Sequence, residues 1–135
     1  MPRPKKNTPI AVRVLIVDDN EEFRANLKMF LSLQENVDVV GEAGNGMRAI
    51  HEAQSLKPDL ILMDIAMPGV NGPEAARIIR TISPESRIVF LTIHDEDTYR
   101  NLSRALRIDG LIAKQFLNVD LPKYLQEFKR IRGYL

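Results

Sequence analysis

The stretch VRVLIVDDNEEF, residues 12–23, sets an apolar run directly before two acidic residues. The run VRVLIV is short and rich in β-branched residues, which is typical of a buried strand in a parallel sheet. Asp18 and Asp19 stand side by side where this strand is predicted to end. Because adjacent carboxylates repel each other and burial penalises each charge further, a group outside the stretch must compensate for them.

Strand-like and helix-like segments alternate along the rest of the chain. Short apolar runs predict strands at residues 12–17, 37–43, 59–64, 87–92 and 110–113. Helical spacing of apolar residues predicts helices at residues 21–34, 44–57, 73–83, 95–107 and 119–132. We expect Asn20 to cap the first helix and the last helix to start near Leu121 or Pro122. The alternation predicts an α/β fold in which helices cover both faces of a parallel sheet.

Length and composition limit the class of protein. The 135 residues suffice for one domain, and 44% hydrophobic with 27% charged residues is ordinary for a soluble protein. The chain has no cysteine, which excludes disulfides and thiolate metal sites, and its net charge of +1 implies no general attraction to nucleic acid. Residues 1–9 combine three prolines with basic residues and lack a signal-peptide pattern. We therefore expect a disordered basic tail on a cytoplasmic protein without membrane contact.

Polar residues follow the predicted strands at the same edge of the sheet. Asp18 and Asp19 follow the first strand, Asp64 ends the third, Thr92 ends the fourth and Lys114 follows the fifth. Ligands of such sheets bind beyond the carboxyl ends of the strands. Each residue alone is explained as a turn former, a strand residue or a solvated charge. Together, they predict a site of three carboxylates, a hydroxyl and an ammonium.

This set of side chains suggests phosphoryl chemistry. Carboxylates without histidine or cysteine suit a hard cation, and Mg²⁺ fits best because it takes one or two carboxylates together with a phosphate. The charge of Mg²⁺ would also compensate for the crowded acids. Asp64 could then act as a nucleophile that forms an aspartyl phosphate. Lys114 would neutralise the phosphoryl oxygens, and Thr92 could donate its hydroxyl to one of them.

With these residues placed, the chain resembles the receiver domain of two-component response regulators. The motifs are VDD after the first strand, LMDIAMPGVNG around the third, LT at the end of the fourth and K after the fifth. The resemblance implies a receiver domain at residues 10–132, with residues 133–135 as a tail or the start of a linker. It also implies a three-layer, flavodoxin-like fold with strand order 2-1-3-4-5.

The resemblance assigns roles to the residues of the site. Asp64 matches the phosphoacceptor, Thr92 the switch hydroxyl and Lys114 the lysine that pairs with the phosphoryl group. Bound Mg²⁺ would be held directly by Asp19, Asp64 and the backbone carbonyl of Ala66, and through water by Asp18. In the family, a histidine kinase or a phosphotransfer protein donates the phosphoryl group. The receiver catalyses only its own phosphorylation and dephosphorylation, so it is a signalling domain rather than an enzyme.

The closest likeness is to the subfamily with a C-terminal helix-turn-helix domain that binds DNA. RIRGYL, residues 130–135, resembles the start of the linker to that domain. We therefore expect control of transcription, with DNA contacted only through an effector domain that is absent from these residues. Receivers of this kind often form homodimers on activation.

Several positions depart from the family pattern on the expected output side. Leu111 occupies the switch position, where the family usually has tyrosine or phenylalanine. Leu106 and Arg107 replace a small Ala-Gly pair, and the bulky Ile93 follows the switch threonine. These departures motivate an alternative hypothesis, in which the chain is a receiver-like protein-interaction module that works without phosphorylation.

Two further hypotheses receive less support. A magnesium-dependent phosphohydrolase with Asp64 as nucleophile would usually carry a second acid two residues later, where this chain has Ala66. A phosphorelay through histidine would need His51 or His94. We expect His51 to lie on the surface of a helix and His94 to lie close to the site.

Overall fold

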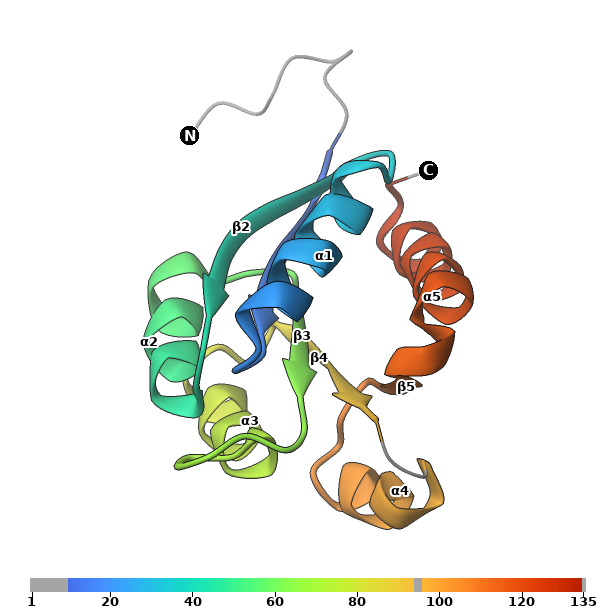
Figure 1. Ribbon diagram of the computed structural model, residues 1–135. Helices are drawn as coiled ribbons and strands as arrows, with labels where there is room; N and C mark the ends of the chain where they lie inside the picture. The colour runs from blue at the N-terminus through green and yellow to red at the C-terminus, as the bar shows by residue number, and fades with distance from the viewer. Residues whose placement is uncertain (1–9, 94–95, 135) are drawn as a thin grey trace.

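The computed structural model describes residues 10–93 and 96–134 (Figure 1). One five-stranded parallel sheet has the order β2-β1-β3-β4-β5, which confirms the predicted topology. Its strands are β1 (Val12–Val17), β2 (Val37–Ala43), β3 (Leu60–Asp64), β4 (Arg87–Thr92) and β5 (Gly110–Ala113). The helices are α1 (Glu21–Ser32), α2 (Gly46–Leu56), α3 (Gly72–Ile82), α4 (Glu96–Ala105) and α5 (Leu117–Arg132), with a 3₁₀ turn, η1, at Lys114–Phe116. The proposed tail, residues 1–9, and His94 lie outside the described residues.

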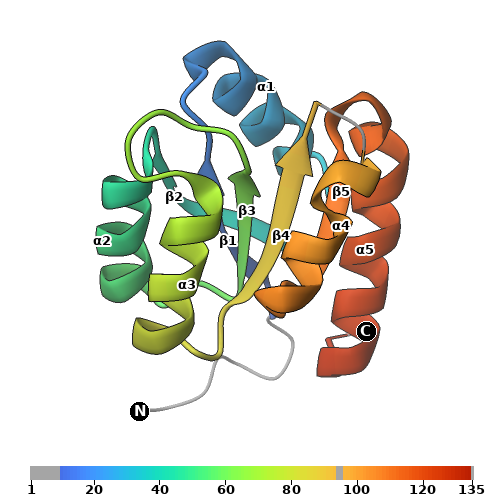
Figure 2. The same ribbon diagram turned by 90° about the horizontal axis from the view of Figure 1, so that it is seen from below.

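Alternate side chains of the central strands build two cores, one on each face of the sheet. Val14 and Ile16 of β1 pack with α1 and α5, whereas Leu15 and Val17 pack with α2 and α3. Figure 2 shows α2, α3 and α4 together on one side of the sheet. The strands are apolar on both faces because helices cover both, as expected for a parallel sheet. Within the described residues, no helix is both long enough and apolar enough to cross a membrane.

Side-chain caps define where three of the helices begin. The amide oxygen of an asparagine accepts a hydrogen bond from the backbone N–H three residues later at the start of α1, α2 and α3. The three asparagines are Asn20, Asn45 and Asn71. Each satisfies one backbone donor that the first turn of a helix leaves unpaired. The predicted cap at Asn20 is confirmed.

The start of the last helix differs from the prediction. α5 begins at Leu117, directly after η1, and Pro122 lies inside it rather than near its first residue. A proline inside a helix removes one backbone hydrogen bond and is usually avoided. Here the burial of Leu117 and Leu121, one turn apart, extends the helix across that position. Packing against the sheet outweighs the local preference of proline.

The end of α4 suggests a stabilising substitution. Arg107 has a left-handed backbone with φ 56° and an exposed side chain. Its position closes the helix, because the N–H of Ile108 donates to the carbonyl of Ser103 at 3.0 Å. This C-terminal position favours glycine, since other residues are strained there. We expect Arg107→Gly to raise the free energy of unfolding by about 1 kcal/mol, measured by denaturant titration.

Arg104 provides the matched control for this prediction. It is an exposed arginine within the last turn of the same helix. Arg104→Gly should lower the free energy of unfolding by about 1 kcal/mol, because glycine is a poor residue inside a helix. Equal losses from both substitutions would contradict the argument from backbone conformation.

Candidate functional site

Three carboxylates gather at the carboxyl edge of the central strands. Asp18 follows β1 and is 0% exposed, Asp64 ends β3 and is 7% exposed, and Asp19 is exposed. One oxygen of each lies within 4.8 Å of the others. They meet because β1 and β3 are neighbouring parallel strands, with Val17 paired to Met63. The structure thus brings together the three acids that the sequence pattern placed at one edge.

Lys114 supplies a positive charge to this acidic cluster. Its Nζ lies 2.6 Å from Oδ2 of Asp18 and 3.9 Å from Oδ1 of Asp64. Its side chain is only 15% exposed, so water screens these interactions less than at an open surface. Lys114 comes from the turn after β5, two strands away from β3. The nearest compensation for the buried charge of Asp18 is therefore this lysine.

The second oxygen of Asp18 organises the loop that leads into α1. Oδ1 accepts a hydrogen bond from the backbone N–H of Asn20 at 2.8 Å, and Asn20 in turn caps α1. Arg24 of the same helix donates to the backbone carbonyl of Asp18 at 2.6 Å and pairs with Glu42 at 3.0 Å. Hydrogen bonds from Lys28 and then Arg24 lower the pKa of Glu42. Glu42 thus ties α1 to the edge strand β2.

The surroundings of Asp64 disfavour the charged form of its carboxyl group. Burial raises its pKa to about 6, Lys114 opposes the increase, and the charge of Asp18 adds to it. The N–H of Ala66 approaches Oδ1 of Asp64 at 3.4 Å, and Ala66 itself is exposed. Helix α3 starts so close to the end of β3 that a Cβ on Gly72 would lie 2.6 Å from the carbonyl oxygen of Asp64. Any larger residue there would displace the loop that follows Asp64.

Thr92 and Leu111 occupy the two positions expected to transmit a change at the site. Thr92 is fully buried at the end of β4, one residue beyond Leu91, which pairs with Asp64. Leu111 lies in β5 and packs, partly buried, against the apolar core beneath α2 and α3. An aromatic ring with a polar tip could alternate between core and solvent at this position, whereas leucine has no polar group to expose. His51 lies on the surface of α2, as predicted.

Phe23 is a residue of the site that the sequence pattern did not reveal. Its apolar spacing indicated only a core position on the first helix. In the structure, Nζ of Lys114 lies 4.1 Å from the centre of the Phe23 ring. The signal for this role is weak, since it consists only of an aromatic residue one turn after the paired acids.

The donor set suits a hard divalent cation. Three carboxylates with closely spaced oxygens, and no histidine or cysteine among them, match the oxygen ligands that Mg²⁺ prefers. Asp19 is the most accessible of the three and Asp18 the most enclosed. This order agrees with a direct ligand at Asp19 and a more remote role for Asp18.

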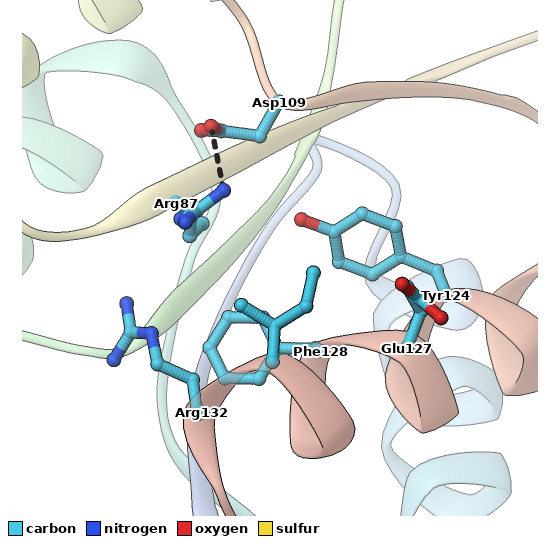
Figure 3. Close-up of a pocket in the computed structure, with 7 residues that line it drawn as sticks. Arg87, Asp109, Tyr124, Glu127, Phe128 and Arg132 are labelled. Atoms are coloured by element: carbon cyan, nitrogen blue, oxygen red, sulfur yellow. Dashed lines mark hydrogen bonds and ion pairs between the residues drawn. The ribbon is translucent and has the colours of Figure 1, made fainter.

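A separate cavity of about 220 Å³ lies at the opposite end of the strands (Figure 3). Its walls include Arg87 at the start of β4, Asp109 just before β5, and Tyr124 of α5. Arg87 pairs with Asp109 at 3.4 Å, and burial followed by the charge of Asp109 raises the pKa of Tyr124 to about 12. Because this cavity adjoins the amino ends of β4 and β5, it is not part of the acidic cluster.

Comparison with known proteins agrees with this geometry. A family model described as "Response regulator receiver domain" matches residues 14–126. Response regulator protein VraR of Staphylococcus epidermidis is 43% identical over 107 residues, covering 78% of this chain and 50% of VraR. Nitrate/nitrite response regulator protein NarL of Escherichia coli is 40% identical over 116 residues, covering 84% of this chain and 53% of NarL.

Solved structures show the same fold. The signal receiver domain of a NarL response regulator from Mycobacterium tuberculosis has a TM-score of 0.82 and 30% identity, covering 90% of this chain and 98% of that domain. The isolated REC domain of RcsB from Salmonella enterica serovar Typhimurium, solved with phosphomimetic BeF₃⁻, has a TM-score of 0.81 and 27% identity, covering 89% of each chain. The chain spans about half the length of the curated relatives it matches. It belongs to the family of response regulator receiver domains.

Proposed function

We propose that the chain is a phosphorylatable switch in which Asp64 accepts a phosphoryl group from a histidine kinase or a phosphotransfer protein. Mg²⁺ would be held by Asp18, Asp19, Asp64 and the backbone carbonyl of Ala66. The observation that carries this proposal is the buried Asp64 carboxylate between two further acids and Lys114. The names of the relatives, all response regulators, support it.

The side chains of the site can divide the work of phosphoryl transfer. With a pKa of about 6, Asp64 is mostly ionised above neutral pH, so its oxygen can attack the phosphorus as the bond to the donor's leaving group breaks. Bound Mg²⁺ would neutralise charge on the phosphoryl oxygens. Lys114 needs only a small movement from Asp18 toward Asp64 to pair with the same group. Thr92 ends the adjacent strand, where its hydroxyl could donate to a phosphoryl oxygen.

The added charge would bias the conformation of the domain. A phosphoryl group carries about two negative charges, which would attract Lys114 and the Thr92 hydroxyl. The curated response regulators that the chain matches are about twice its length. By analogy with them, we propose that the output of the switch is control of transcription through an effector domain. We also propose that the activated protein forms a homodimer and that it is located in the cytoplasm.

The proposal is tested by intact mass after incubation with acetyl phosphate and Mg²⁺. We expect one added phosphoryl group on the wild-type protein and none on Asp64→Asn. Asp38→Asn, which alters an exposed aspartate of β2, is the matched control and should behave as the wild type. Addition that persists in Asp64→Asn would place the acceptor elsewhere. No addition to the wild type, with Mg²⁺ binding shown separately, would favour the phosphorylation-independent interaction module instead.

A further inference from the structure

We propose that Phe23 is a positioning residue for Lys114. The face of its ring would hold the lysine ammonium beside the acidic cluster, within reach of a phosphoryl group on Asp64. This inference rests on the proposed phosphorylation of Asp64. It adds to that proposal a residue of α1 whose ring offers its π-electrons to the ammonium as well as its apolar surface to the core.

Three contacts determine where the ammonium lies. Nζ of Lys114 is 2.6 Å from Asp18, 3.9 Å from Asp64 and 4.1 Å from the centre of the Phe23 ring. The ring is thus about as close to the charge as Asp64 is. An ammonium within about 6 Å of a ring centre is attracted to the negative face of that ring. Lysine has a flexible stem, so each such contact reduces the positions that its ammonium visits.

The backbone around Asp18 places Phe23 where this contact forms. Oδ1 of Asp18 accepts from the N–H of Asn20 at 2.8 Å, and the Asn20 side chain accepts from the N–H of Phe23 at 2.9 Å. Oδ2 of the same carboxylate binds Lys114. One buried carboxylate therefore anchors both the ring, through the start of α1, and the ammonium that lies over it.

Phe23 and Lys114 also line one cavity together. The walls of a cavity of about 230 Å³ between α1 and the start of α5 include Phe23, Leu27, Phe30, Lys114 and Leu117. The ring is therefore part of the cavity wall beside Lys114. Without it, water would approach Lys114 from the side facing α1, and screening would weaken its attraction to the acids.

The geometry explains how the lysine could change partners during phosphoryl transfer. Hydrogen bonds to Asp18 and to a phosphoryl oxygen require different positions of Nζ. Attraction to the face of a ring is less directional, so the ammonium can turn from one acceptor to the other while it stays over Phe23. The ring would thus hold the ammonium within reach of a phosphoryl oxygen before the reaction begins, so less freedom of the lysine is lost in the transfer step.

The test replaces Phe23 site-specifically with mono-, di- and trifluorophenylalanine. Fluorine withdraws charge from the face of the ring while nearly preserving its shape, so packing is retained. We expect the rate of phosphorylation by acetyl phosphate to fall stepwise along the series. Loss of the ring in Phe23→Leu should slow it by about threefold to thirtyfold, the range of a cation–π contact, and Phe23→Tyr should retain the rate.

Phe30 is the matched control. It lies two turns later on α1, lines the same cavity and is likewise partly buried against the same core. Fluorination of Phe30 should leave the rate unchanged. A flat series at Phe23, or equal losses at Phe23 and Phe30, would overturn the inference while the proposed function stood. A wild-type protein that accepts no phosphoryl group would overturn both.

Discussion

Asp64→Asn should raise the free energy of unfolding by about 2 kcal/mol at neutral pH in magnesium-free buffer. Burial raises the pKa of Asp64 from 3.8 to about 6, so the folded protein disfavours the charged carboxylate relative to the unfolded chain. A shift of this size corresponds to about 3 kcal/mol, and solvent at the partly open site reduces it. Asparagine keeps the shape of the side chain and removes the charge. Equilibrium urea unfolding of both proteins measures the difference.

The pH dependence of this difference identifies its cause. Well below pH 3.8, the carboxyl group is protonated in both the folded and the unfolded state, so its burial costs the wild-type protein no stability there. As pH rises from about 4 to about 6, the unfolded chain loses the proton while the folded state retains it, so the wild-type protein loses stability; above that interval both states are ionised. The advantage of Asp64→Asn should therefore grow over this interval and then level off. An advantage that is constant with pH would contradict an electrostatic origin. Asp38→Asn, at an exposed position, should show no such increase.

The edge of the sheet that holds the site was predictable because it follows from strand direction. Apolar runs in parallel strands end at the same edge, so the residues after them must lie near one another. Asp18, Asp64 and Lys114 illustrate this, since each follows or ends a strand whose last residues are buried. No side-chain geometry is needed for that inference, and the structure agrees with it.

The partner of each charge was not predictable in the same way. The sequence pattern suggested that a metal compensates for Asp18, whereas the structure pairs it with Lys114, 96 residues away. This pairing depends on the register of β4 and β5 and on the rotamer of a long side chain. The contact between Phe23 and Lys114 depends in addition on where α1 begins. Such contacts arise from tertiary packing, which apolar periodicity does not describe.

The start of α5 shows a second limit of local reasoning. Pro122 favours a helix that begins at or just before it, and the prediction followed this preference. In the structure, the buried Leu117 extends the helix by more than one turn in the other direction. The free energy gained by burying an apolar side chain exceeds that of one backbone hydrogen bond, so packing decides the boundary.

Lys114→Met should lower the free energy of unfolding by about 2 to 4 kcal/mol in magnesium-free buffer at neutral pH. The substitution keeps most of the apolar stem and removes the ammonium that pairs with Asp18 at 2.6 Å. Asp18 is 0% exposed, so its carboxylate would remain buried beside Asp64 without a cation. Removing one member of a buried ion pair is costly for this reason, even where the intact pair adds little stability. Denaturant unfolding of the two proteins measures the loss.

A double-mutant cycle separates this electrostatic cost from lost packing. In Asp18→Asn/Lys114→Met, the buried carboxylate and its cation are both absent, so the second substitution should restore much of the stability lost in Lys114→Met. Lys123→Met, which alters an exposed lysine of α5, is the matched control and should change stability little. If Lys114→Met were as stable as the wild type, Lys114 would not be the group that compensates for Asp18. In that case the adjacent acids of the VDD motif would depend on the metal alone, and added Mg²⁺ should then stabilise Lys114→Met and the wild-type protein equally.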